Sequence, residues 1–145
     1  DKFIGDAIMA YWGAPAADDD ALAHAITAAE DMQRHLALLN ARWKREGRPT
    51  WSVGIGIHAG DAFVGNVGSP RRLEYTLIGD TVNVASRLCS LAPGGVILVS
   101  EHVALALAPL GRQASSAPEL RYARRDGGDC AAWRLHPLDG EDAPA

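Results

Sequence analysis

The stretch from Glu74 to Leu91, EYTLIGDTVNVASRLCSL, constrains the fold more than any other part of the chain. It begins with a short extended run, turns at Gly79-Asp80 and continues with helical spacing from Thr81. We expect the side chain of Asp80 or Thr81 to cap the free amides at the start of this helix. The stretch therefore predicts a strand, a tight turn and a helix in direct succession.

The predicted helix has two different faces. Val82, Ala85 and Leu88 fall on one face, which we expect to pack on the core. Asn83 and Arg87 are four residues apart and therefore lie together on another face. An amide beside a guanidinium suits an anionic, sugar-bearing ligand, because arginine binds phosphate and the amide orients the sugar. On spacing alone, two solvated surface residues are the more frequent explanation of such a pair.

Two separate segments of the chain carry a longer pattern. Residues 75–87 read Y-T-x-I-G-D-x-V-N-x-A-S-R, and residues 2–10 read KFIGDAIMA. The first resembles the segment that leads through the substrate helix of class III nucleotidyl cyclases. The second resembles the metal-aspartate hairpin of the same family, and the two occur in the family's order.

The rest of the chain predicts an α+β fold. In chain order we expect a hairpin at residues 1–12, a long helix at 21–46, and two strands at 51–58 and 62–67. A projecting loop at 68–72 follows. After the stretch above we expect a strand at 96–99, a helix at 100–108, and two strands at 120–124 and 130–135. Together with the stretch above, this order predicts an α/β sandwich whose mixed, mostly antiparallel sheet carries packed helices. The resemblance implies the ferredoxin-like cyclase core. Gly54 and Gly56, inside the strand at 51–58, predict close approach of a neighbouring backbone or a ligand.

The resemblance implies a metal-dependent active site at a homodimer interface. In class III cyclases two divalent ions, Mg²⁺ or Mn²⁺, assist the 3′-hydroxyl of ATP in attacking the α-phosphate, giving 3′,5′-cyclic AMP and pyrophosphate. Asp6 aligns with a metal-binding aspartate of one subunit. Asn83 aligns with the residue that orients the ribose, and Arg87 with the residue that stabilises charge on the α-phosphate. Both come from the other subunit. From the residues alone, Asp6 beside Gly5 is equally a common turn former.

Lys2 and Thr76 align with the family's purine-recognition pair. A threonine at the second position resembles a subgroup found widely in bacteria and in bicarbonate-responsive cyclases. Lys2 would donate to adenine N1 and the Thr76 hydroxyl would accept from the 6-amino group, which favours ATP over GTP. Lys2 alone is also explained as a solvated lysine at a strand edge.

Arg125 is the best match to the basic residue with which the family binds the triphosphate. The family pattern around that residue is rich in glycine and lysine, and Asp126-Gly127-Gly128 departs from it. Arg125 is therefore assigned on position rather than on a matching motif.

The sequence thus predicts an adenylate cyclase, a phosphorus-oxygen lyase of cyclic-nucleotide signalling. A guanylate cyclase and a catalytically silent dimerisation or sensing domain of the same fold are the alternatives. A silent domain would be free to lose Asp6, Asn83 and Arg87, and all three are present. A diguanylate cyclase is disfavoured because IGDAI, at residues 4–8, stands where that family's GGDEF-type hairpin belongs.

Composition narrows the partners. The net charge of −4 argues against a general nucleic-acid binder. The sequence has no apolar run long enough to span a bilayer, so we expect no direct membrane contact in this segment. Cys89 and Cys130 lack metal-ligand spacing and predict reduced thiols in a cytoplasmic compartment.

The domain boundaries follow from the extent of the resemblance. We expect residues 1–137 to form the cyclase domain and residues 138–145 to form a disordered, acidic tail. Because the chain starts at Asp1 inside a predicted strand, the resemblance implies that a first strand, a phosphate-binding turn and another metal aspartate lie upstream. We therefore expect this segment alone to be inactive.

Overall fold

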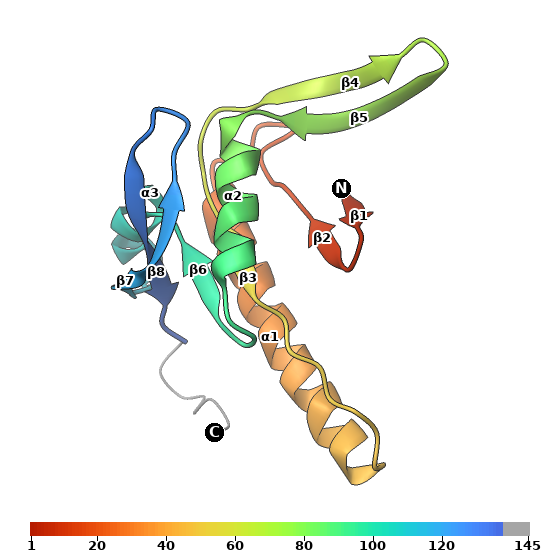
Figure 1. The fold of residues 1–145 in the computed structure, drawn as a ribbon, viewed down its shortest axis with the longest axis vertical. Coiled ribbons are helices and arrows are strands. Elements are labelled where there is room, and N and C mark those ends of the chain that lie inside the picture. Colours follow the sequence, from red (N-terminus) through yellow and green to blue (C-terminus); the bar gives the residue numbers. More distant parts are fainter. Residues whose placement is uncertain (138–145) are drawn as a thin grey trace.

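The computed structural model describes residues 1–137, so the predicted tail at 138–145 lies outside the described residues. The elements follow the predicted order (Figure 1). Their bounds are β1 (Lys2–Ile4), β2 (Ala7–Met9), α1 (Ala21–Arg45), β3 (Ile55–Ile57), β4 (Phe63–Ser69), β5 (Arg72–Ile78), α2 (Asp80–Leu91), β6 (Ile97–Val99), α3 (Glu101–Leu105), the 3₁₀ turn η1 (Ala108–Leu110), β7 (Ala114–Ala123) and β8 (Asp129–Leu135).

The central sheet has four strands in the order β3-β6-β8-β7. Strands β3 and β6 are parallel, whereas β8 pairs antiparallel with both β6 and β7. Hairpins β1–β2 and β4–β5 each form a separate two-stranded sheet. The predicted α+β class with a mixed, mostly antiparallel sheet is confirmed.

Helices cover both faces of this sheet, and β6 shows why. Ile97 and Val99 belong to the core that contains residues of α1 and α3, whereas Leu98, between them, belongs to the core that contains residues of α2. Successive strand residues point to opposite faces, so a strand that is buried on both sides reads as a continuous apolar run. The result is a sandwich with α2 on one face and α1 with α3 on the other.

Two glycines let α2 lie unusually close to the sheet. A Cβ atom added at Gly56 would lie 2.2 Å from the backbone nitrogen of Cys89, and one added at Gly54 would lie 2.2 Å from the carbonyl oxygen of Ala92. These distances are far inside van der Waals contact. The predicted close approach of a neighbouring backbone is therefore confirmed.

Two parts of the molecule extend away from this sandwich (Figure 1). The β4–β5 hairpin projects at one end, and the C-terminal part of α1 projects at the other. The hairpin carries exposed apolar side chains, among them Phe63 and Leu73 at 60% and 59% exposure. No helix within residues 1–137 is both long enough and apolar enough to cross a membrane.

The start of α2 differs from its prediction. The helix begins at Asp80 after Gly79, and no side chain caps it. Thr81 instead donates from its hydroxyl to the carbonyl oxygen of Asp61, at 2.6 Å. The predicted cap was wrong because this hydroxyl finds a partner in the preceding β3–β4 connection.

The buried face of α2 was also predicted imperfectly. Val84 and Leu88 are its buried residues, whereas Val82 and Ala85 are half-buried. Val84 and Leu88 are four residues apart, so the core stripe is rotated from the predicted one. Ala85 instead turns its backbone toward Gly56, where a side chain has no room.

Several element boundaries differ from the predicted ones. The predicted strand at 51–58 is regular only over Ile55–Ile57. The predicted loop at 68–72 is a two-residue hairpin tip, because Ser69 still pairs with Arg72. Helix α3 ends at Leu105, before η1, and β7 begins at Ala114.

Candidate functional site

A cleft of about 430 Å³ opens at the start of α2. Its walls come from the end of β5, the first two turns of α2 and the β7–β8 loop. The lining residues are Leu77, Ile78, Gly79, Asp80, Val82, Asn83, Arg87 and Arg125. The strand, turn and helix singled out in the sequence thus supply most of the wall.

Three predicted site residues meet in this cleft. Asn83 and Arg87 lie one turn apart on α2, and Arg125 reaches the same space from the β7–β8 loop. Arg125 is distant from the other two in sequence, so only the fold brings it there. The charge of the two guanidiniums is partly offset by the Asp80 carboxylate, which also lines the cleft.

The guanidinium of Arg87 is held in position by the backbone. Its Nη1 donates to the carbonyl oxygen of Ala123, at 2.5 Å, at the end of β7. A guanidinium has five N–H donors, so this bond leaves others for a ligand. Arg87 is thus oriented by one hydrogen bond and keeps further N–H donors for a ligand.

A second hollow of about 300 Å³ adjoins the cleft and shares Asp80 and Arg125 with it. Arg124 and Asp126 complete its lining, and they form an ion pair of 3.0 Å between Nη2 and Oδ2. The two hollows together present two nearby arginines of the β7–β8 loop, a suitable arrangement for a ligand that carries several phosphates.

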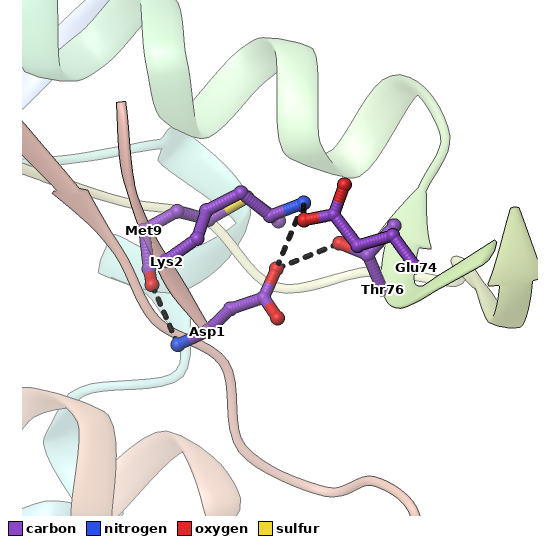
Figure 2. Close-up of polar contacts among 5 residues, drawn as sticks. All are labelled: Asp1, Lys2, Met9, Glu74 and Thr76. Carbon is purple, nitrogen blue, oxygen red and sulfur yellow. Dashed lines mark hydrogen bonds and ion pairs between the residues drawn. The ribbon is translucent and has the colours of Figure 1, made fainter. Parts of the chain in front are cut away.

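Lys2 and Thr76 lie in a separate polar cluster, which Figure 2 shows. Both contact the carboxylate of Asp1: the Thr76 hydroxyl donates to Asp1 Oδ2 at 2.6 Å, and Lys2 Nζ lies 3.6 Å from the same oxygen. Lys2 also forms an ion pair with Glu74, and this contact lowers the pKa of the Glu74 carboxyl. The structure therefore brings the predicted pair together around a residue that the sequence analysis did not single out.

Burial distinguishes the members of this cluster. Thr76 is 6% exposed, and the Asp1 side chain is 9% exposed. The Lys2 and Glu74 side chains are more open, at 26% and 59%. Thr76 lies two positions before Ile78, a residue of the cleft wall, so both point to the same face of β5.

Asp6 lies at the exposed tip of the β1–β2 hairpin. It is not among the residues that line the cleft. Within the described part of the chain, no group of three potential His, Cys, Asp or Glu ligands surrounds a common point. One carboxylate does not make a divalent-ion site, so a site at Asp6 would need further ligands.

A histidine and serine pair is the other noteworthy polar contact. His58 Nδ1 lies 2.7 Å from Ser100 Oγ, and burial lowers the pKa of the imidazole. Ser100 is 1% exposed and accepts a bond from the Val103 amide at the start of α3. A serine enclosed in this way cannot reach a substrate, so the contact is structural.

Sequence reasoning missed Asp1 because its partner Thr76 is 75 positions away. No local spacing reveals a contact of that range. The adjacency of Asp1 to Lys2 was the one available signal, since an acidic neighbour can restrain a lysine.

Residues 2–128 match the family described as "Adenylate and Guanylate cyclase catalytic domain". The chain is 45% identical over 87 residues to Adenylate cyclase 1 of Rhizobium meliloti, covering 60% of this chain and 13% of that protein. It is 44% identical over 109 residues to the adenylate cyclase of Anabaena cylindrica, covering 71% of this chain and 21% of that protein. The chain thus spans only a small part of these relatives.

Solved structures resemble the whole described fold. The adenylyl cyclase CyaB from P. aeruginosa superposes with a TM-score of 0.85 and 26% identity, covering 99% of this chain and 74% of that one. The guanylyl cyclase Cya2 gives a TM-score of 0.76 and 27% identity, covering 96% of this chain and 72% of that one. Enzymes named for either purine nucleotide thus share this fold at similar identity.

Proposed function

Because the chain belongs to the family of adenylate and guanylate cyclase catalytic domains, we propose that it is the catalytic part of an adenylate cyclase. The reaction would convert ATP to 3′,5′-cyclic AMP and pyrophosphate. The convergence of Asn83, Arg87 and Arg125 in one cleft is the observation that carries the proposal. These residues offer one amide and two guanidiniums, which suit a ribose and a triphosphate.

Each cleft residue has a distinct role in this proposal. Asn83 orients the ribose, so that the 3′-hydroxyl faces the α-phosphate. Arg87 stabilises the charge that builds on the α-phosphate, because its guanidinium is already oriented by Ala123. Arg125 binds the triphosphate from the β7–β8 loop.

The base would be recognised by the second cluster. Lys2 donates to adenine N1, and the Thr76 oxygen accepts from the 6-amino group. This pairing supports ATP as the substrate. GTP is the second candidate, since the likeness to a guanylyl cyclase structure is nearly as high as that to an adenylyl cyclase.

We further propose Asp6 as one ligand of a Mg²⁺ or Mn²⁺ ion, or of two such ions. A bound ion would offset the charge of the triphosphate and favour ionisation of the attacking hydroxyl. The remaining ligands would be phosphate oxygens and groups outside residues 1–137.

The active unit in this proposal is a homodimer. Asp6 is not among the residues of the cleft, so one subunit would supply Asp6 and its partner would supply Asn83 and Arg87. The exposed apolar side chains of the β4–β5 hairpin supply a surface for such an association.

The test is an assay of cyclic-nucleotide formation from ATP and from GTP by the full-length protein with Mn²⁺. We expect cyclic AMP as the main product, and we expect its formation to stop when the metal is chelated. Asp6→Ala should lower the rate at least ~100-fold, because a lost ligand removes the ion. Glu119→Ala is the matched control, since Glu119 is an exposed carboxylate that pairs with Arg134.

Cyclic GMP as the main product would replace ATP by GTP in the proposal. A folded dimer that makes neither product would instead identify a catalytically silent domain. Full activity of Asp6→Ala would remove the proposed metal role of that residue.

A further inference from the structure

We infer that Asp1 sets the base preference of the site by fixing the direction of the Thr76 hydroxyl. This inference rests on the proposed function, in which Lys2 and Thr76 contact the purine. It assigns a positioning role to a residue that contacts both of them and no base.

The hydrogen bond between Thr76 and Asp1 determines what Thr76 can offer to a ligand. A carboxylate oxygen only accepts, so the 2.6 Å bond to Asp1 Oδ2 uses the single hydroxyl proton of Thr76. The oxygen of Thr76 then has only lone pairs left. Thr76 is 6% exposed, so little water is available to exchange with Asp1.

An acceptor at this place distinguishes adenine from guanine. Adenine presents an amino group at position 6 and guanine presents a carbonyl oxygen there. A hydroxyl oxygen without a free proton accepts a hydrogen bond from the amino group of adenine. It repels the carbonyl oxygen of guanine, because both atoms then present lone pairs. A hydroxyl that is free to rotate would accept from the amino group of adenine or donate to the carbonyl of guanine. It would therefore discriminate poorly between the two bases.

Asp1 also restrains Lys2, the other half of the pair. The Lys2 ammonium lies 3.6 Å from Asp1 Oδ2 and pairs with Glu74 on its other side (Figure 2). An ammonium has three donors, and only the contact with Glu74 is a hydrogen bond, so a donor is left for adenine N1. Lys2 and Glu74 are the more exposed side chains of the cluster, so in this inference a base reaches Thr76 from their side.

The experiment compares wild type with Asp1→Asn in the full-length protein. The measured quantity is kcat/KM for ATP divided by kcat/KM for GTP. An asparagine amide can donate to Thr76, which frees the hydroxyl proton for a carbonyl oxygen. We expect the ratio to fall about tenfold or more, equivalent to ~1.4 kcal/mol. Asp1→Ser, which is smaller and also neutral, is the second variant if Asp1→Asn does not fold.

Two controls separate this role from simple support of β1. Glu74→Gln removes the other carboxylate that pairs with Lys2 without touching Thr76, and should lower the ratio less than Asp1→Asn does. In a Thr76→Val background, which lacks the hydroxyl, Asp1→Asn should lower the ratio much less than it does in the wild type, because only the effect through Lys2 is left. Thr76→Ser should keep the wild-type ratio.

A ratio that stays the same in Asp1→Asn, with both activities lowered equally, would overturn the inference and leave Asp1 a structural residue. A fall of the ratio as large in the Thr76→Val background as in the wild type would overturn it as well, because the effect would then not depend on the Thr76 hydroxyl. If the wild type forms no cyclic nucleotide, the proposed function has failed. The inference about Asp1 is then tested by the dissociation constants for ATP and GTP. A preference for ATP that Asp1→Asn abolishes supports the inference, and equal affinities in the wild type refute it.

Discussion

At the scale of single residues, the orientation of Arg87 matters more than its charge. One of its donors is committed to the carbonyl of Ala123, and that bond points the guanidinium at the cleft. A planar group held at one corner can meet phosphate oxygens with little loss of freedom. A lysine at this position would keep the positive charge but lose the planar, forked set of N–H donors.

We therefore expect Arg87→Ala to lower kcat by about 100- to 1000-fold and to change KM little, since the contact is strongest in the transition state. Steady-state kinetics with ATP would measure both. Arg134→Ala is the control, because Arg134 is an exposed arginine paired with Glu119 away from the cleft. A rise in KM with unchanged kcat would show that Arg87 binds the ground state and the transition state equally, which contradicts this prediction.

At the scale of elements, the close packing of α2 on β3 places the cleft residues. Gly56 has no room for a side chain, since a Cβ there would lie 2.2 Å from Cys89 N and 2.6 Å from Ala85 O. Both of those atoms are backbone atoms, which cannot rotate away as a side chain can. Any atom added at Gly56 must push the helix outward, and Asn83 and Arg87 would move with it.

We expect Gly56→Ala to destabilise the protein by about 3 kcal/mol, because overpacking forces a backbone shift. Urea unfolding followed by tryptophan fluorescence would measure the change. Gly111→Ala is the control: Gly111 has open space around it and a φ of +67°, so it should cost only ~1 kcal/mol. Equal losses of unfolding free energy in the two variants would mean that α2 can shift away from Gly56 at little cost.

Elements were largely predictable from the sequence, and their details were not. Apolar periodicity locates α1 and α2 to within a residue or two, because each repeats its pattern over several turns. The predicted cap of α2 was wrong, because Thr81 bonds to Asp61, which lies in a different connection. The meeting of Arg125 with Asn83, and of Asp1 with Thr76, depends on tertiary packing that no local pattern contains.

At the scale of the whole molecule, the β4–β5 hairpin is a projecting arm with exposed apolar side chains (Figure 1). Within residues 1–137 its two strands pair only with each other, and Phe63, Leu73 and Tyr75 are 60%, 59% and 47% exposed. Apolar side chains concentrated on a projecting arm favour contact with another surface. In our proposal that surface belongs to a second copy of the chain.

We expect Leu73→Glu to weaken dimerisation of the full-length protein about tenfold or more, because it places a charge in an apolar contact. Sedimentation velocity over a range of concentrations would measure this, and cyclase activity should fall in parallel. Leu105→Glu is the matched control, since Leu105 is 75% exposed but lies on α3. Unchanged association of both Leu73→Glu and Phe63→Glu would rule out the hairpin as the interface.

The glycines of the β3 segment have a consequence at the level of the gene. Every missense change in a glycine codon introduces a residue that carries a Cβ, and at positions 54 and 56 that atom alone overlaps the backbone of the segment from α2 to Ala92. No amino acid is therefore a mild replacement there, whatever its size or polarity. Among natural variants of this protein, these two codons should show silent changes only.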